Sequence, residues 1–187
     1  MNNTLPTMHI VDRYKGQPTK IVFTSTCEIF NGTIDKGLYD IPTDERVPIM
    51  FEDITNPRWS YSIPKALGEN VVSNLDNEWL ILRYFNIVGS SPSGKIGLIN
   101  KGDHLFKNFS IESMKNKPNY KIYGTNYNTY DGSCIRDFIH VCDIAEIHYK
   151  TLKKINDLNV SKILNCGYGK GSTVKEVAKE FGNQINK

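Results

Sequence analysis

The sequence predicts an α/β fold with parallel strands. Residues 21–25 and 79–85 are short, nearly continuous runs of β-branched, aliphatic and aromatic side chains, as is typical of strands buried on both faces of a sheet. Between them, residues 61–74 place apolar side chains at spacings of three and four, the pattern of an amphipathic helix. A strand, a helix and a second strand in this order form a right-handed crossover unit, in which the two strands run parallel.

The rest of the chain continues this alternation. We expect short strands at residues 120–123 and 138–141, a helix at 143–152 and a last strand at 162–166. A final helix should begin at Thr173, because Glu176 follows at the spacing of a capping box. The helical side chains expected to face the core are Ile63, Ala66, Leu67, Val71, Ile144, Ile147, Leu152, Val174, Val177 and Phe181. The stretches 87–103 and 125–133 are expected to be long loops, which usually carry binding residues.

Composition excludes several classes of protein. The 187 residues suffice for one domain with its own core, and the net charge of +3 comes from interspersed charges that form no basic face for nucleic acid. The four cysteines show neither a CxxC spacing nor a metal-type grouping with histidine, so we expect reduced thiols and no metal. No stretch approaches the roughly 20 apolar residues that span a bilayer, and no secretory signal is apparent. A soluble, cytoplasmic protein without a membrane partner is expected.

Tyr61 and Lys65 lie one helical turn apart in the predicted helix. A phenol with its ordinary pKa of about 10 is a poor base at neutral pH, but an adjacent ammonium stabilises the phenolate. Tyr149 and Lys153 repeat this spacing, so the context has to separate the two pairs. Thr26 ends a buried strand, where open α/β sheets place ligands. We therefore predict proton transfer at Tyr61 and Lys65, with Thr26 as partner, and a solvated helix edge at the second pair.

The same residues resemble a known family. A strand ending in Thr-Ser-Thr, with Asn-Pro-Arg-Trp-Ser-Tyr-Ser-Ile-Pro-Lys following at residues 56–65, resembles the extended short-chain dehydrogenase/reductase family. Within it, Arg-Tyr-Phe-Asn at 83–86 and Pro-Ser-Gly at 92–94 are similar to UDP-glucose 4-epimerases. The run Ile-Arg-Asp-Phe-Ile-His-Val at 135–141 is the most specific part of this similarity, which covers about residues 20 to 182.

The resemblance implies a redox-assisted epimerisation with NAD as cofactor. Tyr61 would take the proton of the sugar 4-hydroxyl as hydride leaves C4 for the nicotinamide. Lys65 would lower the pKa of Tyr61 and bind the nicotinamide ribose, and Thr26 would orient the hydroxyl. The resulting 4-keto sugar would turn over and take the hydride back on its other face, which interconverts UDP-glucose and UDP-galactose.

The resemblance also implies two sets of binding residues. The cofactor would contact Ser25, Tyr61, Lys65, Tyr84 and Phe85. The UDP-sugar would contact Thr26, Asn86, His104, Leu105, Tyr123 and Arg136, with Tyr123 at the uracil and Arg136 at the diphosphate, whose oxygens match its planar fork. Structural alternatives stay open for three of these residues: a strand-end hydroxyl for Thr26, a turn cap for Asn86, and a surface ion pair with Asp137 or Glu146 for Arg136. His140 is expected to be structural, and 167–171 a tight turn.

Relative to the family, the chain is expected to be truncated at both ends and to begin at the last turn of a helix. Residues 1–187 would be a single incomplete domain, with a catalytic Rossmann portion at 20–86 and a mostly substrate-binding portion with returning strands at 87–187. This is the carboxyl-terminal half of a doubly wound sheet plus part of a small substrate-binding subdomain. The Gly-rich turn for the NAD pyrophosphate is absent.

The truncation leaves several functional interpretations open. The chain could be inactive by itself, or depend on a second copy or a complementing amino-terminal half. Another NAD-dependent sugar epimerase or dehydratase, and a non-catalytic remnant that binds nucleotide sugars, are the alternatives. Cys27 disfavours dehydration, because it replaces the acid of the Thr-Asp-Glu sequence of related 4,6-dehydratases.

Overall fold

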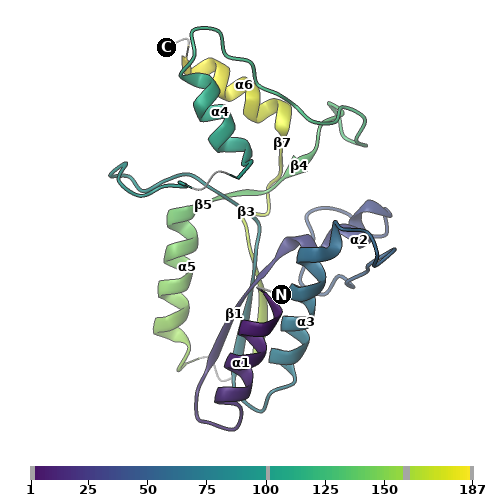
Figure 1. Ribbon diagram of the computed structural model, residues 1–187, viewed down its shortest axis with the longest axis vertical. Coiled ribbons are helices and arrows are strands. Elements are labelled where there is room, and N and C mark those ends of the chain that lie inside the picture. The colour runs from purple at the N-terminus through teal and green to yellow at the C-terminus, as the bar shows by residue number, and fades with distance from the viewer. Residues whose placement is uncertain (1–2, 100–101, 158–160, 186–187) are drawn as a thin grey trace. The chain divides into compact units, whose positions relative to one another are not determined.

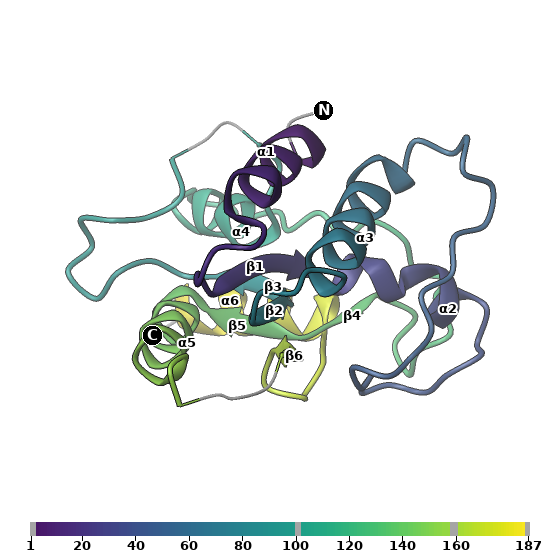
Figure 2. The same cartoon turned by 90° about the horizontal axis from the view of Figure 1, so that it is seen from below.

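The computed structural model describes residues 3–99, 102–157 and 161–185, in two compact units. The first unit comprises Met1–Phe85 and Glu146–Gly167, and the second comprises Asn86–Ala145 and Tyr168–Lys187. Figure 1 labels most elements of both units along the chain, and Figure 2 labels β2 and β6 as well. Each unit is described by itself below.

The first unit is built on a sheet of three parallel strands. Strands β1 (Ile21–Thr26), β2 (Trp79–Tyr84) and β6 (Lys162–Cys166) lie in the order β1-β2-β6. All three predicted strands are thereby confirmed. Helices α1 (Thr4–Tyr14) and α3 (Trp59–Ser73) pack against each other, and both lie on the same side of β1 (Figure 2). Helix α5 (Val141–Lys154) crosses from the second unit into the first.

The core of the first unit joins α1 and α3 to the sheet. Val11, Ile21, Val72 and Ile81 form one buried cluster, to which each of these elements contributes. After β1 the chain turns through a short 3₁₀ helix η1 (Cys27–Phe30) and α2 (Asn31–Asp35). Burial of the α1 and α3 faces against β1 and β2 fixes the end of β1, where Thr26 lies.

Two helical side chains expected in the core are exposed. Leu67 of α3 is 45% exposed and Leu152 of α5 is 63% exposed. In α3 the face that packs against β1 runs through Gly68 and Val72. Gly68 lies so close to the sheet that a Cβ there would be 2.4 Å from the Phe23 ring. Leu67 therefore lies beside the buried face. The apolar spacing predicted the helix correctly, but it wrongly assigned Leu67 to the buried face.

The second unit has two small sheets and two helices. Strand β3 (Asn86–Val88) pairs in parallel with β5 (Phe138–His140), and β4 (Ile135–Arg136) pairs antiparallel with β7 (Ser172–Thr173). Helices α4 (Leu105–Ser113) and α6 (Val174–Ile185) enclose the cluster Phe109, Val177 and Ala178. The predicted capping box is confirmed: the Thr173 N–H donates to Glu176 Oε2 at 2.8 Å, and the Glu176 N–H donates to Thr173 Oγ1 at 3.1 Å.

Other sequence-based boundaries differ from the structure. Residues 120–123 form no strand, because the Tyr120 ring packs 5.0 Å from that of Phe109 and its hydroxyl lies 2.9 Å from Ser113 Oγ. The first helix has 11 residues, where only a last turn was expected. Strand β3 occupies the start of the predicted loop 87–103, whereas 125–133 is a loop as predicted.

None of the described helices is both long enough and apolar enough to cross a membrane.

Candidate functional site

Tyr61 and Thr26 meet where β1 ends and α3 begins. The Thr26 side chain lies close enough to Tyr61 to lower the pKa of its phenol as a hydrogen-bonding neighbour, and Thr26 Oγ1 accepts the Glu28 N–H at 3.2 Å. The strand-end alternative for Thr26 thus occurs in the structure, and its partnership with Tyr61 stays a prediction. Tyr61 itself remains 44% exposed, so its hydroxyl can reach a bound molecule.

Trp59 fixes the first turn of α3, which carries Tyr61. Its side chain is 1% exposed and meets the Phe51 ring edge to face at a centroid distance of 5.4 Å. A Cβ on Gly32 would lie 3.4 Å from Trp59 Cη2, so the indole is packed on that side as well. A turn with such an anchor holds Tyr61 in place without using the phenol itself.

Lys65 lies on the same face of α3, one turn beyond Tyr61. Its Nζ donates to the carbonyl oxygen of Thr24 in β1 at 2.8 Å and lies 5.9 Å from the centroid of the Tyr61 ring. Partial burial lowers the pKa of Lys65. An ammonium with one bond to a carbonyl keeps two N–H groups for other acceptors.

The pKa of Tyr61 is raised in this structure. Burial is the largest cause, the hydrogen bond to Thr26 opposes it, and the neighbouring charges of Glu28 and Cys27 add to it. The family resemblance implies a lowered pKa, so the direction in this structure is the opposite one. An additional positive charge near the phenol would lower its pKa.

Three other residues expected at the cofactor lie near the ends of the same strands. Ser25 Oγ is buried, and no hydrogen-bond partner for it occurs in the described part of the chain. The Tyr84 hydroxyl lies 2.5 Å from Nε2 of His148, and burial, followed by the charge of Cys166, raises the pKa of Tyr84 to about 12. The Phe85 side chain packs against a core cluster. Ser25 thus has a buried hydroxyl without a partner among the described residues, whereas the Tyr84 hydroxyl is engaged within the protein.

The expected substrate residues beyond Phe85 belong to the second unit. Asn86 pairs with Phe138 across β3 and β5, and its N–H donates to the Asp137 carbonyl oxygen at 3.0 Å. This pairing brings Asn86 close in space to the segment that contains Arg136. The exposed Arg136 guanidinium donates to the Ile135 carbonyl oxygen at 2.8 Å.

Three other residues expected at the substrate, Tyr123, His104 and Leu105, also belong to the second unit. Tyr123 is 79% exposed. His104 is the amino-terminal cap residue of α4 but makes no capping bond with its side chain, and Leu105 packs against the Phe109 cluster. These positions provide exposed rings and a guanidinium, but the structure of this unit does not bring them together as one set.

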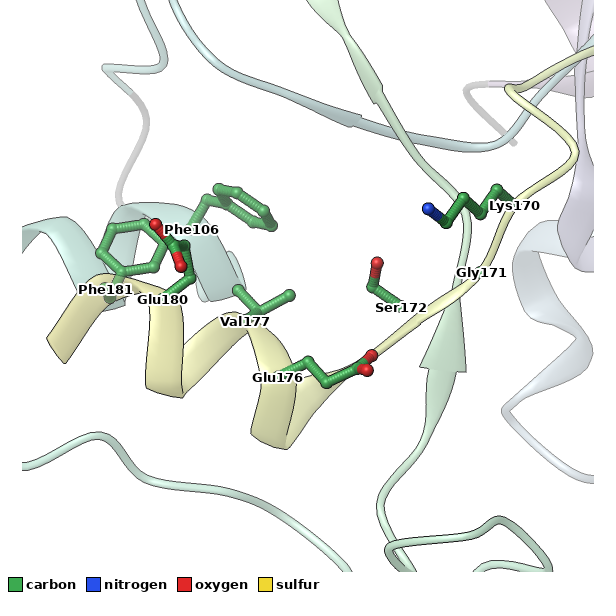
Figure 3. A pocket seen from close by; sticks show the side chains of 8 residues that line it. All are labelled: Phe106, Lys170, Gly171, Ser172, Glu176, Val177, Glu180 and Phe181. Atoms are coloured by element: carbon green, nitrogen blue, oxygen red, sulfur yellow. The ribbon is translucent and has the colours of Figure 1, made fainter. Parts of the chain in front are cut away.

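A separate pocket of about 420 Å³ lies in the second unit (Figure 3). It is bounded by one face of α6, the segment before it and Phe106 of α4, and its lining is Phe106, Lys170, Gly171, Ser172, Glu176, Val177, Glu180 and Phe181. None of the predicted site residues lines it. Across the described residues, no group of three or more His, Cys, Asp and Glu side chains could hold a metal ion.

The structure also reveals a buried ion pair that the sequence analysis missed. Glu69 of α3 and Arg83 of β2 have side chains only 6% and 4% exposed. Their bond is bidentate, with Arg83 Nε 2.9 Å from Glu69 Oε1 and Nη2 2.7 Å from Oε2. The signal in the sequence was an arginine within an otherwise apolar strand and a glutamate four residues after Lys65.

Comparison with known proteins decides the family. Residues 1–167 match the NAD dependent epimerase/dehydratase family. The chain belongs to this family. Its UDP-glucose 4-epimerase relative from Azospirillum brasilense is 34% identical over 165 residues, covering 86% of this chain and 44% of the relative. A probable UDP-arabinose 4-epimerase from Arabidopsis thaliana is 34% identical over 184 residues, covering 94% of this chain and 41% of the relative.

A solved epimerase shares the fold of this family member. UDP-glucose 4-epimerase from Bifidobacterium longum, in complex with NAD+ and UDP, matches with a TM-score of 0.76 at 27% sequence identity. The match covers 99% of this chain and 54% of the Bifidobacterium chain. The predicted fold class, part of a Rossmann-like α/β domain, is confirmed. The chain spans about half the length of the relatives it matches.

The residues of the first unit fit one end of the family's cofactor, NAD. The unpartnered Ser25 hydroxyl and the remaining N–H groups of Lys65 are donors suited to a nicotinamide ribose. The sequence contains no Gly-x-x-Gly-x-x-Gly turn for the pyrophosphate. The given sequence thus contains donors suited to the nicotinamide end of NAD and no Gly-rich turn of this kind.

Proposed function

We propose that this chain provides the proton-transferring half of a nucleotide-sugar 4-epimerase. The observation that carries the proposal is the arrangement at the end of β1: Lys65 Nζ donates to the Thr24 carbonyl oxygen at 2.8 Å and lies 5.9 Å from the centroid of the Tyr61 ring. Thr26 lies close enough to Tyr61 to lower the pKa of its phenol. A hydroxyl pair of this kind can pass a proton from a sugar 4-hydroxyl to the phenolate oxygen. The family supports the reaction class, and the matched relatives support UDP-sugars as substrates.

In this proposal each residue has a separate task. Thr26 orients the sugar hydroxyl and relays its proton, Tyr61 holds that proton, and Lys65 stabilises the phenolate and binds the nicotinamide ribose. NAD, when bound, would take the hydride from C4 and give it back on the other face of the 4-keto sugar. The proton returns from Tyr61 after the 4-keto sugar has turned over.

The second unit is proposed to bind the nucleotide. Asn86 and Arg136 would bind the diphosphate, since an amide and a guanidinium are good donors to phosphate oxygens. The exposed ring of Tyr123 would stack on the uracil, and His104 and Leu105 would flank the substrate. UDP-glucose and UDP-arabinose are both candidates, because relatives named for each match this chain at equal identity.

A further segment is proposed to complete the cofactor site. Strand β1 pairs only with β2 among the described strands, so its other edge can accept another parallel strand. A complementing amino-terminal half that carries a Gly-rich turn fits this edge. A homodimer is a second proposed state, and a cytoplasmic location remains an expectation.

Activity and binding assays test the proposal. With NAD and UDP-glucose, we expect the chain alone to form no UDP-galactose, and the chain joined to an amino-terminal half with the Gly-rich turn to form it. Turnover by the chain alone would contradict the need for that half. No turnover by the completed protein with any UDP-sugar would contradict epimerase function.

The alternative is a protein that binds UDP-sugars without catalysis, for which the exposed Tyr123 ring and Arg136 guanidinium are the proposed binding groups. Calorimetry with UDP separates the two functions: binding of UDP by a completed protein that turns over no UDP-sugar would support the binding protein. A folded chain that binds no UDP in either form would rule out the alternative.

A further inference from the structure

Each nitrogen of Arg83 and each carboxylate oxygen of Glu69 has a hydrogen-bond partner within the first unit. Both oxygens of the carboxylate are used by the guanidinium, and the remaining Arg83 nitrogen, Nη1, donates to the Glu45 carbonyl oxygen at 3.0 Å. The guanidinium carbon also lies 4.9 Å from the centroid of the Phe30 ring. The geometry therefore leaves Arg83 little freedom to move.

Stability alone is a weak explanation for this pair. Moving two charges out of water costs free energy that their attraction often only offsets, and apolar replacements of similar volume are frequently neutral or stabilising. Buried ion pairs do in some proteins determine which arrangement of elements is adopted. In this protein the pair connects helix α3 to strand β2.

Its position points to Lys65. Lys65 and Glu69 are four residues apart on α3, so they lie on one face and about 6 Å apart along the axis. Lys65 is bonded to β1 through the Thr24 carbonyl oxygen, and Glu69 to the neighbouring strand β2 through Arg83. Two attachments to adjacent strands fix both the rotation and the axial position of this half of the helix.

Pro64 makes this second attachment more important. A proline within a helix has no N–H, so α3 lacks the backbone hydrogen bond that would join residue 64 to the Ser60 carbonyl oxygen. The turn anchored by Trp59 is therefore less firmly coupled to the turn that carries Lys65. We propose that Glu69 and Arg83 are positioning residues, which hold the Lys65 ammonium on β1 beside Tyr61. The inference rests on the role proposed above for Lys65.

The test uses the chain described here and needs neither cofactor nor substrate. The variant Glu69→Leu/Arg83→Met removes both charges without leaving one of them unpaired. The acylation rate of each lysine is measured by mass spectrometry as a function of pH, together with the thermal unfolding midpoint. We expect the midpoint of unfolding to be kept or raised, while the pH midpoint of Lys65 acylation rises towards the ordinary lysine value of about 10.4.

Two further variants keep the test decisive. Arg83→Lys preserves the charge but not the fork, so Lys65 should shift in the same direction even if the double variant does not fold. Glu52→Gln removes an exposed ion pair with Lys36 in the same unit and should leave Lys65 unchanged. Folded variants in which the Lys65 midpoint stays at its original value would overturn the proposal. This result is independent of whether the protein binds UDP-sugars or turns them over.

Discussion

Helices α3 and α5 carry the same Tyr-x-x-x-Lys spacing in different surroundings. In α3, Lys65 Nζ bonds to a strand carbonyl oxygen, and Thr26 at the end of β1 lowers the pKa of Tyr61 against the larger effect of burial. In α5, Lys153 Nζ lies 4.5 Å from the centroid of the Tyr149 ring, which is 58% exposed. The first pair is attached to a sheet, whereas the second pair has, among the described residues, a contact between its own two side chains. Spacing makes two side chains neighbours, but the strand end gives them a chemical environment.

The anchoring of the two helices gives the largest expected difference. Trp59→Ala should lower the free energy of unfolding by about 3–5 kcal/mol, because it empties a packed site at the start of α3. Leu152→Ala in α5 should change it by less than about 0.5 kcal/mol, because that side chain is exposed. Urea denaturation of both variants measures this. Equal losses would show that α5 is anchored as firmly as α3.

Removing the two lysines sharpens the comparison. In a protein completed with the Gly-rich turn, Lys65→Met should weaken NAD binding roughly tenfold or more, since a hydrogen bond from a charged group contributes about 1.5–3 kcal/mol. Lys153→Met should have no measurable effect. Isothermal titration calorimetry with NAD tests both variants. Comparable losses in the two would remove the distinction between the pairs.

The smallest expected effect is on the pH dependence of stability. Burial lowers the pKa of Lys65, so the unfolded chain holds that proton more tightly and stability rises as pH increases towards about 10.4. Burial raises the pKa of Tyr61, so this group makes stability fall above about pH 10. Denaturation between pH 9 and 11 should therefore show a more negative slope for Lys65→Met and a more positive one for Tyr61→Phe. Slopes that move the same way would contradict the assigned directions.

The sequence predicted elements whose signal is local. The strands β1, β2 and β6 have near-continuous apolar runs, and the capping box at Thr173 and Glu176 needs only two residues at one spacing. Residues 120–123 also had strand-like composition, but Tyr120 is held by aromatic contacts with α4 and α6, which no local pattern contains. Leu67 was misplaced for the same reason, because the close approach of Gly68 to Phe23 is a tertiary contact.

The candidate site was only partly predictable. Tyr61, Thr26 and Lys65 could be connected because a strand end and a helix face meet in any crossover unit. The raised pKa of Tyr61 depends on how deeply α3 packs, and the bond from Tyr84 to His148 depends on α5. The Glu69–Arg83 pair was missed because a charge in a strand pattern carries no indication of its partner.

The most direct test compares the two tyrosines. In the completed protein, Tyr61→Phe should lower turnover of the UDP-sugar by about 10²–10⁴-fold, the usual contribution of a positioned acid or base. Tyr149→Phe removes the same hydroxyl group from a tyrosine on an exposed helix edge, and it should leave turnover within about twofold of the unsubstituted protein. That ratio is the result predicted for a proton-transferring pair at Tyr61 and Lys65. Equal turnover by the two variants would contradict it.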